Sequence, residues 1–208
     1  MKTKIQIIGP PRSGTTSLYE AFRDNINYTT GIFEPINQNS QYKIPISQTL
    51  NPQLKSHLNV INSSPTNIIE KNVIFISSLT SLDEQIISIT SFYKKYLISF
   101  DKIIFIYRND IESQAKSLKN CMTSGNWFFP YKPLDKVNYE DMFPIIEAQN
   151  TIVKNLSNFF NIPLTYYEDL YSNNINYLNK FLNSYNIKLN APNNFYFRMD
   201  TKNRLKQS

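Results

Sequence analysis

The sequence predicts an α/β fold, a three-layer sandwich with a central parallel sheet. Three short apolar runs, at residues 3–8, 72–78 and 102–107, have the continuous β-branched and aromatic character of strands that are buried on both faces. Segments of helical length lie between them, and strands that alternate with helices are typical of a parallel sheet covered by helices. In such folds ligands bind beyond the carboxyl ends of the strands.

The first predicted element is the strand at residues 3–8, which ends in a Gly-Pro-Pro turn. A helix is predicted directly after this turn, because Leu18, Ala21 and Phe22 fall on one face of a helical pattern. A weaker strand is predicted at residues 163–167. Further helices are predicted at about residues 82–99, 110–121, 139–160 and 173–184.

Two stretches of the chain show no sustained period. Residues 36–67 are rich in Asn, Gln, Ser and Pro, and residues 123–137 mix aromatic residues with turn formers. Loops of that length inside a compact domain are usually functional lids or else helices or strands that the sequence pattern fails to reveal. A chain of 208 residues is expected to form one domain. We therefore predict a single domain over residues 1–208 with these two stretches as candidate lids.

Composition narrows the classes of function. The chain has one Cys and one His, which excludes a disulfide framework and argues against a dedicated zinc site. Its net charge of +6 is spread along the chain with no run longer than the pair Lys94-Lys95, which favours a small polyanionic ligand over nucleic acid. The amino-terminal stretch has neither a signal-peptide pattern nor a membrane anchor, so a soluble, cytoplasmic protein is expected.

The turn after the first predicted strand carries the clearest functional motif. It reads GPPRSGTT from Gly9 to Thr16 and opens a helix, so its backbone N–H groups and the positive end of the helix dipole are expected to face an anion. The spacing of Gly9 and Gly14 fits the phosphate-loop template GxxxxGK[ST], but Thr15 stands where the template has lysine. The cation lies three residues earlier, at Arg12. The motif therefore predicts a P-loop-like sandwich that binds phosphate without the usual loop lysine.

The segment PPRSGTT resembles the 5′-phosphosulfate loop of sulfotransferases, which bind 3′-phosphoadenosine 5′-phosphosulfate (PAPS). It is especially similar to this loop in the tyrosylprotein and bacterial branches. The resemblance implies that the chain transfers a sulfuryl group from PAPS to a hydroxyl or amine of an acceptor, with no metal ion. It also implies that Arg12 contacts the transferred group and that Ser13, Gly14, Thr15 and Thr16 surround the 5′-phosphate.

A second segment, KIIFIYRNDIESQAKSLK at residues 102–119, places Arg108 at the carboxyl end of a predicted strand. Ser113 and Ser117 lie four residues apart on the helix that follows, hence on one face. An arginine and a hydroxyl so placed can hold a phosphate by charge-assisted hydrogen bonds, and the segment resembles the sulfotransferase element for the 3′-phosphate of PAPS. That family usually spaces the two residues eight apart, whereas Arg108 and Ser117 are nine apart. We expect Arg108 to bind the 3′-phosphate with Ser117, or alternatively Ser113, as its partner.

The third segment, YYEDL at residues 166–170, follows the weaker predicted strand. A tyrosine at the carboxyl end of a strand offers a flat apolar face that suits a purine. The segment is similar to the YEDL element of sulfotransferases, which implies that Tyr167 contacts the adenine and that the pair Glu168-Asp169 is structural. The three segments occur in the order of the family and extend over most of the chain.

Sulfuryl transfer to a hydroxyl needs a group that takes the acceptor's proton. Glu34 is the favoured base, because the tyrosylprotein and heparan branches resemble this chain in having a Glu at about that distance after the basic residue of the loop. His57 is the alternative, since the segment KSHL looks like the KTHLP element of cytosolic sulfotransferases and an unperturbed pKa of ~6.5 suits a base. If the strand at residues 72–78 is instead the equivalent one, Ser77 and Ser78 line the site and His57 is a loop residue without a role.

Two other functions stay open on the sequence. A P-loop kinase or nucleotide hydrolase with a degenerate lysine would bind ATP and Mg²⁺, although Thr15 argues against it. A sulfotransferase-like protein without turnover would serve as a binding module. The acceptor is not written in the sequence, but the aromatic residues between Trp127 and Tyr131 could stack on a sugar or a phenol, or fold over the core. Neither nucleic acid nor a membrane is expected as a partner.

Overall fold

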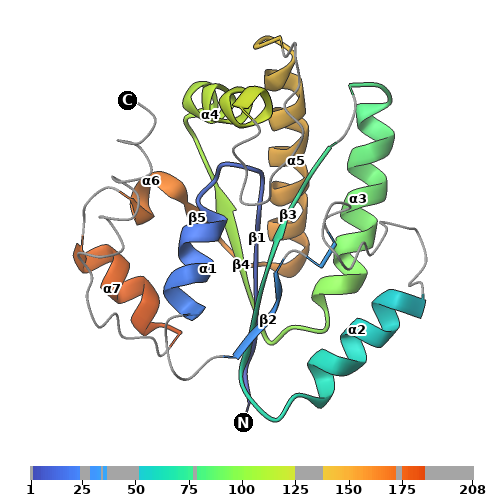
Figure 1. Cartoon of the computed structure of the whole chain (residues 1–208), viewed down its shortest axis with the longest axis vertical. Helices are drawn as coiled ribbons and strands as arrows, with labels where there is room; N and C mark the ends of the chain where they lie inside the picture. The colour runs from blue at the N-terminus through green and yellow to red at the C-terminus, as the bar shows by residue number, and fades with distance from the viewer. Residues whose placement is uncertain are drawn as a thin grey trace.

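The computed structural model describes residues 2–23, 29–33, 35–36, 52–76, 79–124, 138–171 and 175–185. Within these ranges the strands form one sheet in which every neighbouring pair is parallel, in the order β2-β3-β1-β4-β5 (Figure 1). The strands are β1 (Lys4–Gly9), β2 (Thr29–Phe33), β3 (Ile68–Val73), β4 (Lys102–Tyr107) and β5 (Leu164–Tyr166). The helices are α1 (Thr15–Arg23), α2 (Pro52–Ser63), α3 (Leu82–Leu97), α4 (Ile111–Ser124), α5 (Met142–Phe160), α6 (Tyr167–Leu170) and α7 (Ile175–Asn183).

Helices cover both faces of the sheet. α1, α6 and α7 lie on one side of it, α2, α3 and α5 lie on the other, and α4 lies at the carboxyl edge (Figure 1). The predicted α/β sandwich with a central parallel sheet is thereby confirmed for the described part of the chain. In that same part, no helix is both long and apolar enough to cross a lipid bilayer.

The strands are apolar on both faces because each face meets a layer of helices. In β1, Ile5 and Ile7 belong to the core cluster that includes residues of α1 and α7, whereas Ile8 belongs to the cluster of α2, α3 and α5. In β4, Ile104 and Phe105 divide between the two clusters in the same way. Burial of one such side chain contributes about 1.5–3 kcal/mol, so both layers are held to the sheet.

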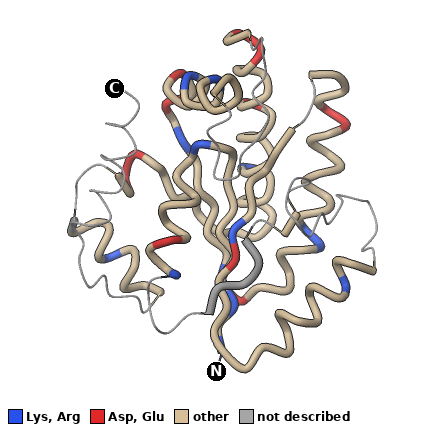
Figure 2. The backbone as a smooth tube through the Cα atoms, in the orientation of Figure 1, with Lys and Arg blue, Asp and Glu red and all other residues tan. Residues whose placement is uncertain are grey.

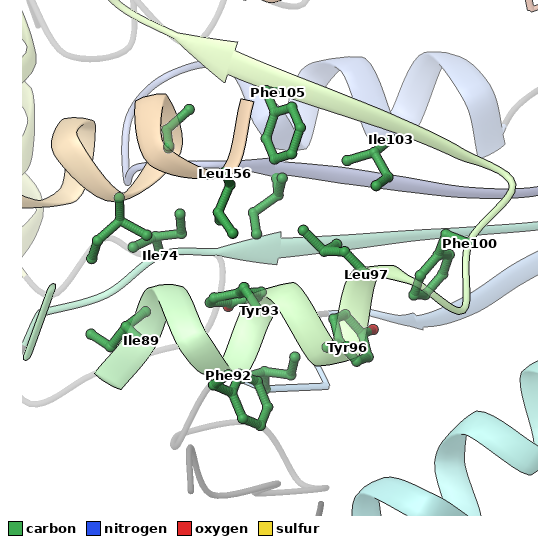
Figure 3. Packing of buried hydrophobic residues seen from close by; sticks show 14 of the residues in the cluster. Ile74, Ile89, Phe92, Tyr93, Tyr96, Leu97, Phe100, Ile103, Phe105 and Leu156 are labelled. Atoms are coloured by element: carbon green, nitrogen blue, oxygen red, sulfur yellow. The ribbon is translucent and has the colours of Figure 1, made fainter. Parts of the chain in front are cut away.

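The larger core cluster is rich in aromatic residues from α3 (Figure 3). The rings of Tyr93 and Tyr96 meet edge to face with centroids 6.2 Å apart, and Phe92 and Tyr93 do so at 5.4 Å. Figure 3 shows Tyr93 on the side of α3 that faces the strands, where Leu156 of α5 and Phe105 of β4 also lie, and Phe92 on the other side of the helix. Edge-to-face pairs add to the stabilisation from burial, so α3 is packed firmly on this face.

One predicted strand is displaced along the chain. The sequence predicts a strand at residues 72–78, but β3 spans Ile68–Val73. The apolar run misleads because the middle of β3 is polar. Glu70 is paired in register with Gln6 of β1, and the buried hydroxyl of Tyr96 donates to Oε2 of Glu70 at 2.8 Å and lies 3.2 Å from Oε1 of Gln6. Buried polar side chains are tolerated in a strand when they are hydrogen-bonded in this way.

The prediction of a loop at residues 36–67 is wrong over part of its length. Residues 52–63 form α2, and Leu54, Leu58 and Ile61 on one face of this helix are buried in the larger core cluster. β2 lies where the sequence predicts no element. Residues 37–51 of the first candidate lid and residues 125–137 of the second lie outside the described residues.

Candidate functional site

The turn between β1 and α1 lies at the carboxyl edge of the sheet, close to α4 (Figure 1). We call residues 10–14 of this turn the phosphate loop. β1 and β4 are neighbours, but the chain leaves β1 for α1 on one face of the sheet and leaves β4 for α4 and α5, which packs on the other face. Such a switch point separates two adjacent loops, and α/β proteins bind ligands in the crevice between them.

The phosphate loop has the backbone of an anion site. The φ angle is 64° at Arg12 and 86° at Gly14, with Ser13 between them. Residues in left-handed and right-handed conformations that alternate along a loop can turn successive N–H groups toward one side, as in the concave anion-binding nests of other proteins. The buried hydroxyl of Ser13 donates to the Pro10 carbonyl at 2.7 Å and closes the turn.

Gly14 lies too close to α6 to carry a side chain. A Cβ atom on Gly14 would lie 2.5 Å from the ring of Tyr171 and 2.9 Å from the ring of Tyr167. The hydroxyl of Tyr171 donates to the Gly14 carbonyl at 2.9 Å. The loop and the turn at α6 are therefore packed against each other, and Tyr171 is a site residue that the sequence analysis did not find.

Two side chains of α4, one turn apart, contact the phosphate loop. The amide of Gln114, which is fully buried, donates to the Pro11 carbonyl at 2.7 Å. The hydroxyl of Ser117 accepts from Nε of Arg12 at 2.8 Å. Of the two serines predicted for this face of the helix, Ser117 is therefore the one beside the loop.

Arg108 connects the end of β4 to the same loop. Its Nη1 donates to the Arg12 carbonyl at 3.1 Å, and its guanidinium lies over the ring of Tyr167, 4.4 Å from the centroid. Its Nε is buried and has no hydrogen-bond partner among the described residues. Figure 2 shows basic positions meeting where the phosphate loop and the end of β4 approach α4. Arg108 and Ser117 thus both contact Arg12, Arg108 at its backbone carbonyl and Ser117 at its side chain.

Tyr167 packs between charged and aromatic neighbours. Besides the Arg108 guanidinium, the ring of Tyr171 lies 4.5 Å from it, centroid to centroid. Burial raises the pKa of the Tyr167 hydroxyl, and the nearby positive charge of Arg108 opposes this shift. The phenol is therefore neutral at physiological pH and presents a hydroxyl that can donate.

The first turn of α4 is fixed by two carboxylates. Asp110 accepts the N–H of Ser113 at 2.9 Å, and hydrogen bonds from the Ser113 side chain and backbone lower the pKa of Asp110. Glu168 of α6 accepts the N–H groups of Asn109 and Asp110, each at 3.0 Å. Asp110 thus caps the N-terminus of α4, and Glu168 joins α6 to the start of α4.

Lys71 is a further residue that the sequence analysis missed. It lies in β3, is only 1% exposed, and its Nζ donates to Thr16 Oγ1 at 2.7 Å. No local motif marks it, because the displaced strand at residues 72–78 excludes it from the predicted sheet. The phosphate loop therefore has a buried cation beside the first turn of α1.

His57 occupies a different place from the one predicted. It lies on α2, not in a loop, and its Nε2 is 3.1 Å from Oε2 of Glu70. Glu70 also accepts from Tyr96 at 2.8 Å. Glu70 and Lys71 are adjacent in β3, so their side chains lie on opposite faces of the sheet, and α2 lies toward the amino ends of the strands (Figure 1). The structure does not bring His57 to the phosphate loop.

The described residues thus gather Arg12, Arg108, Ser117 and Tyr167 around the turn between β1 and α1. Glu34, Ser77 and Ser78 lie outside the described residues, as do the aromatic residues between Trp127 and Tyr131.

No protein-family model matches this chain, and no curated protein is similar to it in sequence.

Proposed function

We propose that this chain is a PAPS-dependent sulfotransferase, which moves a sulfuryl group to a hydroxyl or amine of an acceptor. The observation that supports the proposal is the meeting of three sequence motifs around one loop. Arg12 is separated by 105 residues from Ser117 and by 96 residues from Arg108, yet it is hydrogen-bonded to both. A turn that only connects a strand to a helix can form without the guanidinium groups of Arg12 and Arg108.

In this proposal the phosphate loop binds the 5′-phosphosulfate. The N–H groups from Ser13 to Thr16 lie at the N-terminus of α1, where backbone donors and the helix dipole favour an anion. Arg12 keeps Nε on Ser117. Because a guanidinium carries five N–H donors, its Nη groups are left to bind oxygens of the sulfuryl group and of its bridge to phosphate.

Arg108 is assigned to the 3′-phosphate. Its buried Nε has no partner among the described residues, and a buried donor of this kind calls for an acceptor. Ser117 is connected to Arg108 through Arg12 and supplies a hydroxyl to the same group. Tyr167 is assigned to the adenine, which it would contact with the part of its ring that Arg108 and Tyr171 leave uncovered.

Glu34, the residue that follows β2 in the chain, is proposed as the base. It takes the proton of the acceptor while the acceptor oxygen or nitrogen forms a bond to sulfur. The bond between sulfur and the bridging oxygen breaks, and its electron pair stays on that oxygen, which leaves as the 5′-phosphate of 3′,5′-adenosine bisphosphate (PAP). Arg12 neutralises the charge that develops there. As in phosphoryl transfer, positioning and charge stabilisation carry the reaction.

Release of PAP from PAPS, measured with a panel of phenols, sugars and amines, tests this activity. We expect Arg12→Met to lower the rate by about 10²–10³-fold, as is typical when a donor to a developing charge is removed. Glu34→Gln should lower it by about 10²–10⁴-fold and leave the affinity for PAP unchanged. Arg23→Met is the matched control, because Arg23 is an exposed arginine in the last turn of α1. Full turnover in both site variants would refute the mechanism.

The two alternatives predict different results in the same assay. A kinase or nucleotide hydrolase would consume ATP with Mg²⁺ and leave PAPS intact. A binding module of the same fold would bind PAP but release none from PAPS with any acceptor. The lysine position held by Thr15 argues against the first alternative.

A further inference from the structure

Lys71 is a buried cation next to the first turn of α1. It lies in β3 in register with Ile7 of β1, on the face of the sheet that α1 covers. The residue is only 1% exposed, and its Nζ donates to Thr16 Oγ1 at 2.7 Å. Thr16 lies where the phosphate loop passes into the positive end of the helix dipole.

The chemistry of this contact fixes the role of the Thr16 hydroxyl. An ammonium group has three donors and no acceptor, so Thr16 Oγ1 has to accept from Lys71. The hydroxyl proton of Thr16 then points away from Lys71, and no acceptor for it is recorded in the described part of the chain. Thr16 is partly exposed, so its O–H can donate to an anion at the N-terminus of α1.

From this arrangement we infer that Lys71 is a positioning residue of the nucleotide site. It holds Thr16 as a donor to the 5′-phosphate, and it places a positive charge behind a loop in which Thr15 replaces the usual lysine. The inference rests on the proposed function, because the 5′-phosphate of PAPS is the anion in question. A charge that is shielded from water acts on an anion more strongly than an exposed one, since the effective dielectric constant is lower.

Calorimetric titration with PAP and with adenosine 3′-monophosphate, which lacks the 5′-phosphate, tests the inference. Lys71→Met keeps an unbranched side chain and removes its charge, and Thr16→Val keeps the shape of the side chain and removes its hydroxyl. Each variant should weaken PAP binding by about ten- to hundredfold, as expected for the loss of a hydrogen bond to a charged group. Neither should change the affinity for adenosine 3′-monophosphate.

The double variant distinguishes a coupled pair from two separate effects. It should bind PAP no more weakly than the weaker of the single variants, because both substitutions remove parts of one interaction. A merely structural lysine would instead change the affinities for PAP and adenosine 3′-monophosphate by the same factor. Arg23→Met, which removes an exposed positive charge, controls for net charge and should bind PAP like the wild type.

The outcomes separate this inference from the proposed function. A wild-type protein that binds neither nucleotide would refute the proposed function itself. A wild-type protein that binds PAP, together with a Thr16→Val variant that binds it equally well, would overturn the inference alone, even if Lys71→Met fails to fold. Additive losses in the double variant would overturn it as well.

Discussion

Arg12 serves three parts of the candidate site at once. Its backbone adopts the left-handed conformation, its carbonyl accepts from Arg108, and its Nε donates to Ser117. A non-glycine residue in this conformation costs about 1–2 kcal/mol, so the contacts from β4 and α4 have to hold it in place. Strained backbone that its surroundings fix in this way is typical of functional turns.

For His57, a structural role and a catalytic role predict different effects of substitution. It is buried against Glu70 and Tyr96, on the face of the sheet away from Lys71. Loss of one partner of a buried hydrogen bond costs about 1–3 kcal/mol, and more when the group left behind is charged. We expect His57→Leu to lower the free energy of unfolding in urea by at least about 1 kcal/mol and to leave PAP affinity and turnover unchanged. Wild-type stability with abolished turnover would instead identify His57 as the base.

The residues of the candidate site differ in how far the sequence around them predicts their position. Arg12 and Arg108 each follow an apolar run, so the sequence alone places both at the carboxyl edge of a sheet. The hydrogen bond between Ser117 and Arg12 could not be predicted, because it depends on where α4 lies over the phosphate loop. Lys71 has no motif around it at all, and its role is visible only once β3 packs beneath α1.

The stabilisation that the Asp110 carboxylate gives to the start of α4 depends on pH. Its pKa is lowered from the ordinary value of 3.8, mainly by hydrogen bonds from the side chain and backbone of Ser113. A lowered pKa in the folded state means that the carboxylate stabilises the fold at pH above its ordinary value of 3.8, and that this stabilisation is lost as the pH falls through the lowered value.

Capping at this position predicts a measurable stability difference. Asp110→Ala should lower the free energy of unfolding by about 1 kcal/mol at neutral pH, and its difference from the wild type should shrink as the pH falls through the lowered pKa of Asp110. Asp110→Asn is the control, since an asparagine also caps a helix but does not titrate in this range. A loss in Asp110→Ala that is equally large in strong acid and at neutral pH would contradict this role.

The helices and strands also differ in how well the sequence predicts them. β1, β4 and the helices α3, α4 and α5 carry strong apolar patterns and lie close to their predicted ranges. α2 was not predicted because Asn, Gln and Ser residues surround its apolar face of Leu54, Leu58 and Ile61. β3 was misplaced because its polar residues Glu70 and Asn72 are hydrogen-bonded to the hydroxyl of Tyr96, 26 and 24 residues further along the chain, which no local pattern can reveal.

At the scale of the whole molecule, strand order creates the site. The alternation of strands and helices predicts a parallel sandwich, but it does not say that β4 lies beside β1 with β5 next to it. That order puts the ends of β1, β4 and β5 side by side at the carboxyl edge (Figure 1). The phosphate loop, Arg108 and Tyr167 follow these three strand ends, so their meeting is a consequence of topology.

A ligand that engages all three strand ends should stabilise the whole domain. At a concentration of PAP about 100-fold above its Kd, the folded state gains about 2.7 kcal/mol. For a domain of this size, that gain corresponds to a rise in Tm of about 5–10 °C.

The most direct test of the central claim is the Tm of the protein with PAP beside its Tm with 5′-AMP, which lacks only the 3′-phosphate. If the chain binds PAPS as proposed, PAP raises the Tm, and 5′-AMP at the same concentration raises it much less. Arg108→Met then removes this difference between the two nucleotides. Equal shifts with both, no shift with either, or a shift with ATP and Mg²⁺ alone would contradict the claim that this chain binds PAPS.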